Sequence, residues 1–110
     1  MKEIKAIVRP SRLHKIRDAF RLLPGFPGMN ISHVEGCSAH SGAELHGTLK
    51  EELTDFTKKL RIEIVAPDEM LADILEVIHR HAYTGQTGDG VLWVTEVQEF
   101  RRLCTSLAKP

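Results

Sequence analysis

Several features of exported, membrane-spanning or nucleic-acid-binding proteins are scarce or missing in this sequence. Only two of its 110 residues are cysteine, and its first ten residues lack the long apolar stretch of a signal peptide. No apolar run approaches the roughly 20 residues that span a bilayer. Basic and acidic residues number 15 each, so the sequence lacks the basic excess typical of nucleic-acid-binding domains. We therefore expect a cytoplasmic protein that is neither embedded in a membrane nor bound to nucleic acid.

Arrangements of residues that would indicate catalysis are missing as well. No motif places a histidine beside Cys37 or Cys104, and no pair of carboxylates stands out. The length suits one domain over residues 1–110, with a core large enough to fold without disulfides or a structural metal. We expect a binding or regulatory domain rather than an enzyme.

Two segments of the chain, residues 4–16 and 61–74, repeat one design. In each, a strand with an Ile-Val pair is followed two residues later by a proline, Pro10 or Pro67. Proline suits the start of a helix, and Asp68 is placed to cap the second helix or to favour its positive end. Apolar residues then recur at helical spacing in both halves: Leu13, Ile16, Phe20 and Leu23, and Leu71, Ile74, Leu75 and Ile78.

Each expected helix is followed by turn residues and a further strand. The first turn is residues 24–28 (PGFPG), and the second is residues 84–90 (TGQTGDG), which leads into VLWVTEV. The order is therefore β-α-β, β-α-β, which predicts an α+β domain of ferredoxin-like type, with one sheet and both helices on one face. Trp93 in the last strand is expected to lie in the core or at a subunit contact.

Residues 36–58 form an unusually long connection for a small domain. They contain few bulky apolar residues, and loops beyond roughly 12–15 residues are usually functional or disordered. We expect a protruding, mobile loop, within which TLKEELTDF (residues 48–56) forms a short helix capped by Thr48.

The glycine-rich turn of residues 84–90 is typical of a site where a ligand approaches the main chain. Glycines let a phosphate or a ribose reach backbone N–H groups. Asp89 can hydrogen-bond a sugar hydroxyl, or it can simply fix the turn. A glycine-rich turn is also typical of a plain connector.

Several motifs together resemble the PII family of signal-transduction proteins over nearly the whole chain. The segment TGQTGDGVLWV resembles the B-loop of that family (here residues 84–90), IVRP and GM resemble its first half, and RIEIVAPDEM resembles its central strand. Residues 36–58 lie where the family carries its T-loop. The resemblance implies a homotrimer of ferredoxin-like subunits that bind ATP or ADP in clefts between subunits. The T-loop then docks on a transporter, an enzyme or a transcription regulator.

By position, the resemblance implies a set of nucleotide-binding residues: Ile7, Gly36, Glu63, Val65, Gly88, Asp89, Gly90 and Arg102, the last reaching a phosphate from the neighbouring subunit. Lys59 matches an anion-binding lysine at the foot of the T-loop. Two phosphate-binding cations of the family are replaced, by Val91 and Cys104, so ADP or AMP is as good a candidate as ATP. Residues 38–40 (SAH) replace the Arg-Gln pair that helps hold 2-oxoglutarate, so the second effector is left open between 2-oxoglutarate, a small anion such as bicarbonate, and a metal ion.

A second hypothesis rests on histidine and cysteine in and near the long loop. The residues are His33, Cys37, His40 and His46. Imidazole and thiolate are good ligands for zinc or copper, although the spacings match no standard zinc pattern. The alternative function is a metal sensor or buffer linked to heavy-metal efflux, and a third is a trimeric scaffold that has lost its ligands.

Cys104 has three interpretations: a buried residue of a C-terminal strand, a redox-sensitive thiol near the cleft, or a disulfide partner of Cys37.

For the whole chain we expect a regulator that binds adenine nucleotide between subunits, together with a small-molecule effector. Its T-loop then controls a partner, most simply a membrane transporter, by a population shift between loop states.

Overall fold

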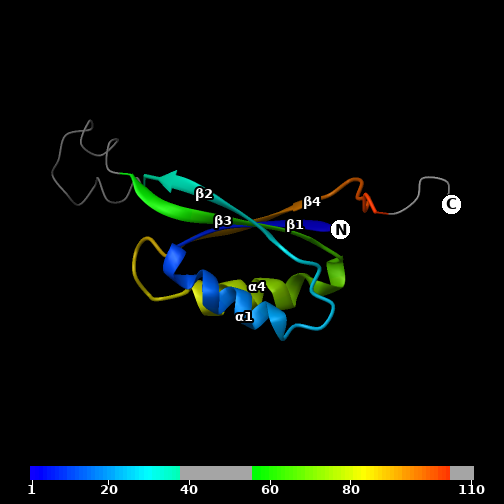
Figure 1. Cartoon of the computed structure of the whole chain (residues 1–110), viewed down its shortest axis with the longest axis horizontal. Helices are drawn as coiled ribbons and strands as arrows, with labels where there is room; N and C mark the ends of the chain where they lie inside the picture. Colours follow the sequence, from blue (N-terminus) through cyan, green and yellow to red (C-terminus); the bar gives the residue numbers. More distant parts are fainter. Residues whose placement is uncertain (38–55, 105–110) are drawn as a thin grey trace.

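The computed structural model describes residues 1–37 and 56–104. Its elements in chain order are β1 (Lys2–Val8), the 3-10 turn η1 (Pro10–Arg12), α1 (Leu13–Arg21), β2 (Asn30–Gly36), β3 (Thr57–Ala66), the 3-10 turn η2 (Asp68–Met70), α4 (Leu71–Ala82) and β4 (Gly90–Glu96). They form two layers, with the sheet above and both α-helices beneath it (Figure 1). The expected mobile loop, apart from its two ends, and its short helix lie outside the described residues.

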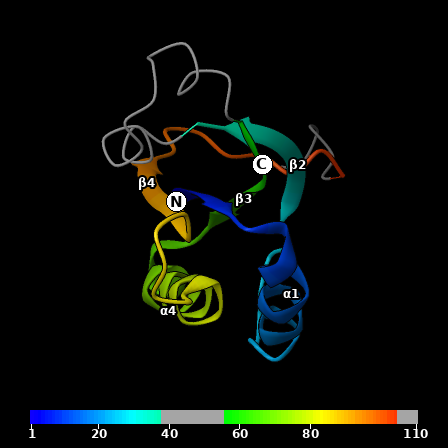
Figure 2. The same ribbon diagram turned by 90° about the vertical axis from the view of Figure 1, so that its left-hand side faces the viewer.

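All strand pairs are antiparallel, and the four strands lie in the order β2-β3-β1-β4. Each β-α-β half therefore contributes one edge strand and one central strand. Seen from the end, α1 lies beneath the β2 side of the sheet and α4 beneath the β4 side (Figure 2). The predicted ferredoxin-like arrangement is confirmed, because one sheet carries both helices on one face.

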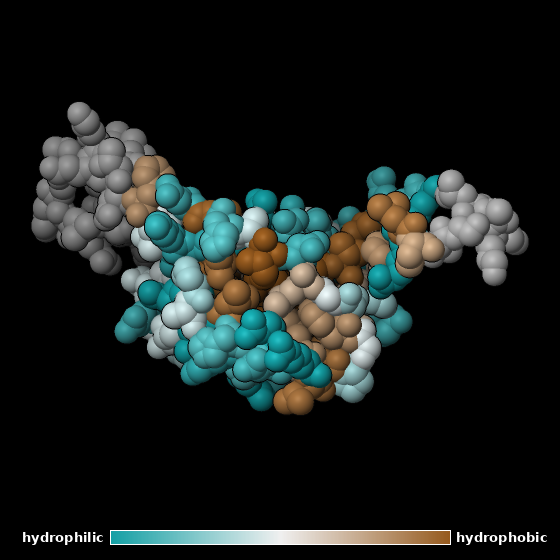
Figure 3. All heavy atoms as spheres, viewed as in Figure 1, coloured by the Kyte–Doolittle hydropathy of each residue, from teal (hydrophilic) through white to brown (hydrophobic). Residues whose placement is uncertain are grey.

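The core lies between the sheet and the helices. Successive side chains of a strand point to opposite faces, and Ile4, Ala6 and Val8 of β1 are buried while Ile7 between them is only half-buried. Figure 3 shows hydrophobic residues gathered between the two layers. The predicted helix stripes are confirmed, and Phe20 also stacks on Phe26 with ring centroids 4.1 Å apart. The buried residues are Ile4, Ala6, Val8, Ile16, Phe20, Leu60, Ile62, Ile64, Ala66, Ile74, Ile78 and Ala82.

The two prolines of the repeat mark helix starts as predicted. Of the two roles predicted for Asp68, the cap is wrong, while its place in the first turn of η2 agrees with a role at the positive helix end. Pro10 begins η1, and Pro67 directly precedes η2. Neither η2 nor α4 has a side-chain cap. Asp68 instead accepts a hydrogen bond of 2.8 Å from the N-terminal ammonium of Met1, which lowers the pKa of its carboxyl group. The carboxylate is thus engaged by the chain terminus and not by the helix backbone.

The last strand, β4, matches the predicted VLWVTEV segment to within one residue at each end, but no strand continues from it to Cys104. The last residue of β4, Glu96, pairs with Lys2, and the next backbone hydrogen bond, from Val97 N–H to the Met1 carbonyl, uses the end of β1. Residues 97–104 lie beyond the end of that partner and form no strand. Cys104 is exposed in a turn, so its interpretation as a buried strand residue is wrong.

A disulfide between Cys37 and Cys104 of one chain does not fit this fold. Cys37 follows β2 at the Thr57 end of β3, whereas β4 ends on the side of Ala66. These ends are about 30 Å apart along a ten-residue strand, while a disulfide needs Cα atoms within about 7 Å. Figure 1 shows residues 97–104 (orange to red) extending away from β2.

None of the described helices has both the length and the apolar character needed to cross a bilayer.

Candidate functional site

The turn between α4 and β4 is organised around the carboxylate of Asp89. One oxygen accepts hydrogen bonds from the backbone N–H groups of Thr84 (2.7 Å) and Gly85 (2.9 Å). The other accepts from the Thr84 hydroxyl and from Nε of Arg9 at 3.2 Å. The bonds from Thr84 are the largest cause that holds the pKa of Asp89 far below its usual range. Of the two roles that the sequence left open, fixing the turn is the one this geometry shows.

Gly90 is required by the backbone of the neighbouring strand. Its φ is +113°, and a Cβ atom there would lie 1.8 Å from the carbonyl oxygen of Ile7. The reason is that β4 begins at this residue, opposite Val8. The sequence indicated a glycine for ligand approach, but the structure explains Gly90 by contact within the chain.

Two cations attach the turn to the adjacent strands. Arg9, directly after β1, donates to Asp89 and, through Nη2, to the Thr87 carbonyl at 2.9 Å. Lys59 of β3 donates to the Gly88 carbonyl. Burial, and next the nearby Arg9, lower the pKa of Lys59, while Asp89 opposes that shift. Two positive groups and the single negative charge of Asp89 therefore meet at a glycine-rich turn, which leaves one net positive charge there for an anion.

Arg9 is the site residue that sequence reasoning missed. The sequence did contain features that point to Arg9. It belongs to the IVRP motif and follows Ile7 by two residues, so it lies on the same face of the strand. The proline that follows drew attention to the helix start instead. Lys59, in contrast, was predicted as an anion-binding residue, and the structure places it beside Arg9.

Six predicted site residues lie at one end of the sheet. Ile7 pairs with Val91 at the start of β4. Gly36 ends β2 beside Lys59, whose Cγ would be 3.9 Å from a Cβ at that glycine. We call this the loop end of the sheet, and its predicted residues are Ile7, Gly36, Lys59, Gly88, Asp89 and Gly90.

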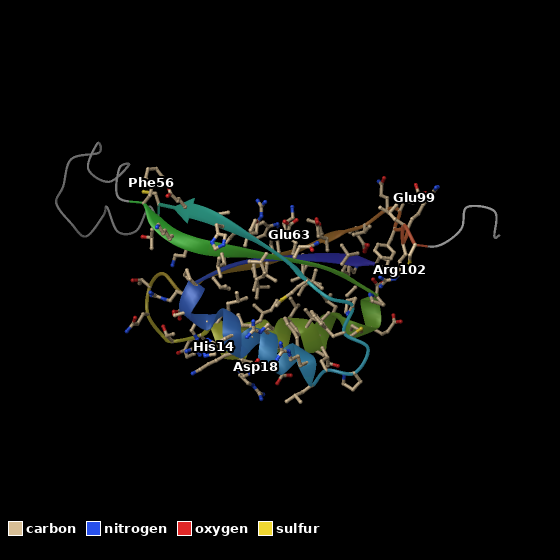
Figure 4. All side chains as sticks on the ribbon, in the orientation of Figure 1. His14, Asp18, Phe56, Glu63, Glu99 and Arg102 are labelled. Atoms are coloured by element: carbon tan, nitrogen blue, oxygen red, sulfur yellow. The ribbon has the colours of Figure 1, made fainter. Side chains whose placement is uncertain are left out.

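The other three predicted nucleotide-binding residues lie away from the loop end. Glu63 and Val65 point to the face of the sheet opposite the helices, with Glu63 3.5 Å from Nε of Arg61. Their Cα atoms are about 10 and 17 Å further along β3 than Leu60, the partner of Val8. Arg102 lies at the far end of the sheet, which we call the C-terminal end, with its guanidinium 5.5 Å from the centre of the Phe100 ring (Figure 4). One chain alone therefore does not bring the predicted nucleotide site together.

A cavity of about 450 Å³ lies between the end of α4 and β4, next to the glycine-rich turn. This volume is within the usual range for small-molecule sites. Its wall is mostly apolar, with Asp89, His79 and Tyr83 as its polar groups. The lining residues are Ile7, Val8, Leu75, Ile78, His79, Ala82, Tyr83, Asp89, Gly90, Val91 and Leu92. The loop end thus has an apolar hollow beside the turn, while Arg9 and Lys59 contact the turn without lining that hollow.

The predicted metal ligands are not brought together by the part of the chain that the structure describes. His33 and Cys37 are both exposed, and their spacing of four residues along β2 corresponds to about 13 Å. Ligands of one zinc ion lie about 2 Å from it. Within residues 1–37 and 56–104, no three His, Cys, Asp or Glu residues form a group that could hold a metal. His40 and His46 lie outside these residues, so the metal hypothesis gains no support.

Comparison with known proteins identifies the family. The model of the family described as Nitrogen regulatory protein P-II matches residues 1–106. Nitrogen regulatory protein P-II 1 of Escherichia coli K12 is 37% identical over 106 residues, which cover 96% of this chain and 93% of that protein. Two further relatives are each 34% identical over 106 residues, which again cover 96% of this chain and 93% of the relative. They are the Nitrogen regulatory protein P-II of Bradyrhizobium diazoefficiens and that of Azospirillum brasilense. This chain belongs to the P-II family of nitrogen regulatory proteins, whose members are signalling proteins and not enzymes.

Proposed function

We propose that this chain is a cytoplasmic P-II-type regulator that assembles as a homotrimer and binds an adenine nucleotide between neighbouring copies. The nucleotide is ADP, AMP or ATP, accompanied by a small-molecule effector such as bicarbonate. Binding biases the state of the loop at residues 36–58, and this loop controls a partner protein such as a membrane transporter. Family members bind partner proteins and form trimers, which supports the general scheme.

The observation that carries the proposal is the separation of the predicted site into two groups. The loop end holds Arg9, Lys59 and the glycine-rich turn, and the C-terminal end holds Arg102. Two ends of the same sheet cannot contact one nucleotide within one chain. They can do so if the C-terminal end of one copy lies against the loop end of the next.

The charges at the loop end support an anionic ligand. Val91 and Cys104 remove two cations that the family uses for phosphates, which on their own would weaken triphosphate binding by a few kcal/mol. Arg9 and Lys59 remain, and both are already oriented by the turn. Because both donate to the turn, a phosphate or carboxylate that binds there must compete with the carbonyl of Gly88 or Thr87.

Isothermal titration of chelator-treated protein with ATP, ADP and AMP, each with and without bicarbonate, tests the proposal. We expect micromolar binding of at least one nucleotide, and loss of that binding in Arg102→Ala. Arg80→Ala is the matched control, because Arg80 is an exposed arginine whose contact is an ion pair on α4. An absence of heat with all three nucleotides would contradict the nucleotide role while leaving the family assignment intact.

A further inference from the structure

The hollow between α4 and β4 has one wall that takes no part in the proposed nucleotide site. Leu75, His79 and Tyr83 form this wall on α4 and at its end, and none of them is a predicted nucleotide-binding residue. The turn of residues 84–90 connects α4 to β4 and borders one end of the hollow (Figure 2). The two cations of the loop end do not line it. The proposed function therefore assigns no occupant to this hollow.

A second hollow of about 540 Å³ adjoins the first along α4. Both are lined by Leu75, His79 and Tyr83, and the second also reaches Glu76 and Arg80. The Glu76 carboxylate and the Arg80 guanidinium form an ion pair of 2.5 Å, so this end carries no net charge. The two hollows form one groove, with core residues as its floor and the exposed rings of His79 and Tyr83 at its rim.

The charge of the groove limits what can enter it. Among the described residues that line the first hollow, with histidine neutral, Asp89 is the only one with a charged side chain. Its carboxylate accepts hydrogen bonds from the Thr84 and Gly85 amides, from the Thr84 hydroxyl and from Arg9. A carboxylate has about four lone-pair sites, so Asp89 has none left for a ligand. Because burying an unpaired charge is costly, a molecule that fills this hollow must be uncharged.

The rim of the groove is suited to an aromatic molecule. The His79 and Tyr83 rings lie with centroids 6.2 Å apart and planes tilted by 58°, and Tyr83 is 63% exposed. Within the described residues, neither side chain makes a hydrogen bond. A neutral imidazole and a phenol each offer a donor and an acceptor, and aromatic rings pack well in tilted or offset contacts. The rim therefore fits a flat ring that carries hydrogen-bonding nitrogen atoms at its edge.

We propose that this groove binds an uncharged, nitrogen-containing aromatic molecule of about two fused rings, at a site separate from the nucleotide. The ring packs on the apolar floor, and its nitrogen atoms hydrogen-bond His79 and Tyr83. The volume of about 450 Å³ lies in the lower part of the range for small-molecule sites and suits a ligand of this size. Because Asp89 and Gly90 border the hollow, the bound molecule also restricts the turn. The inference goes beyond the proposed function and does not depend on nucleotide binding.

NMR titration of the isotope-labelled chain with benzimidazole tests the site. This probe has two fused rings, one N–H donor and one nitrogen acceptor, and it is uncharged at neutral pH. We expect saturable shifts at the amides of Leu75, His79 and Val91, with a dissociation constant of about 1 mM or tighter. The Phe100 amide at the C-terminal end should not shift. An absence of saturable shifts up to about 10 mM would overturn the proposal.

Substitutions at the rim test whether these two rings hold the probe. Tyr83→Ala and His79→Ala should each raise the dissociation constant about fivefold or more, and both residues are exposed, so the fold should persist. Phe100→Ala and His14→Ala are the matched controls, because they remove an exposed aromatic ring and an exposed histidine elsewhere. The proposal fails if the rim variants bind like the wild type, or if the controls lose as much affinity as they do.

Two further comparisons test the charge of the ligand and the separation from the nucleotide. Benzoate, which is similar in size but charged, should bind about tenfold more weakly than benzimidazole, and equal affinity would contradict the uncharged site. Saturating AMP should leave the benzimidazole constant unchanged within about twofold, whereas a rise of about tenfold would show that the nucleotide occupies the groove. Arg102→Ala should bind benzimidazole like the wild type, so failure of the proposed nucleotide site and failure of this groove give different results.

Discussion

The two ends of the sheet differ in how many of their side chains are held by contacts within the chain itself. At the loop end, Arg9 and Lys59 fasten the glycine-rich turn to β1 and β3, and Asp89 holds the turn closed. At the C-terminal end, Leu103 is 99% exposed and Phe100 41% exposed. The loop end exposes apolar side chains as well, such as Tyr83 (63%) and Val91 (62%), but its turn is held by hydrogen bonds within one chain, whereas the C-terminal end presents Arg102 and Leu103 outward. This contrast is what a ligand site shared between copies requires.

The largest effect is expected for Gly90→Ala at the loop end. The new Cβ would collide with the Ile7 carbonyl, and alanine is strained at a φ of +113°. We expect a loss of roughly 3 kcal/mol or more in the free energy of unfolding, measured by urea denaturation. Gly28→Ala is the matched control, because Gly28 has a φ of +109° but nothing within 4 Å of a new Cβ. Equal losses in the two variants would show that the contact with Ile7 is unimportant.

A large effect on binding is expected from Arg102→Ala, with hardly any effect on the single chain. The Arg102 side chain is exposed beside Phe100, so the change in unfolding free energy should stay within about 0.5 kcal/mol. Nucleotide affinity should fall by about tenfold or more, as measured by titration calorimetry. If stability falls and affinity does not, the C-terminal end has a structural role in place of a ligand role.

Arg9→Ala should weaken nucleotide binding less completely. It removes one of two cations at the loop end and frees the Thr87 carbonyl, but Lys59 remains. We expect a fall in affinity of about tenfold, consistent with one charge-assisted hydrogen bond, and a larger fall for ATP than for AMP. Arg17→Ala on α1 is the control of equal charge, and a similar loss in that variant would indicate a general charge effect.

The smallest effect is the acid sensitivity that Asp89 gives to the turn. Because the folded-state pKa of this carboxyl lies below its unfolded value of about 3.9, its stabilising contribution is present above that value and is lost as the pH falls towards the folded pKa. Hydrogen exchange should show that the Thr84 and Gly85 amides keep their protection, relative to the Ile62 amide, above about pH 4 and lose it progressively as the pH falls from there to about 2. In Asp89→Asn this pH dependence should disappear, and its persistence would show that another group closes the turn.

Most of the fold could be predicted from the sequence because its signals are local and repeated. Two strands could be predicted from the alternation of apolar and other residues around Ile4 and Ile64. Both helices could be predicted from the apolar stripes through Ile16 and Ile74, and the two prolines marked where they begin. The cap expected from Asp68 was wrong because its hydrogen-bond partner, the N-terminal ammonium, lies 67 residues away in the chain, whereas its place in the first turn of η2 fits the alternative role at the positive helix end. The interpretation of Cys104 as a strand residue was wrong because β4 ends where its partner β1 ends, and that depends on the pairing register of the two strands.

The site could be predicted only in part. The glycine-rich turn carries a sequence motif, and Lys59 was found through its position in the family pattern. Arg9 was missed because its role depends on the turn folding back onto the end of β1, 80 residues away in sequence. The separation of Arg102 from the loop end was implied by the family resemblance, and the geometry of one chain agrees with it.

The central claim, that each nucleotide site uses the loop end of one copy and the C-terminal end of another, can be tested by complementation. Asp89→Ala and Arg102→Ala would be produced separately and together, with different tags, so that mixed trimers can be isolated. A mixed trimer contains one interface in which both residues are intact. We predict that each variant alone binds nucleotide at least about tenfold more weakly than the wild type, whereas the mixed trimer binds about one nucleotide with nearly wild-type affinity. No binding by the mixed trimer, or normal binding by Arg102→Ala alone, would contradict the claim.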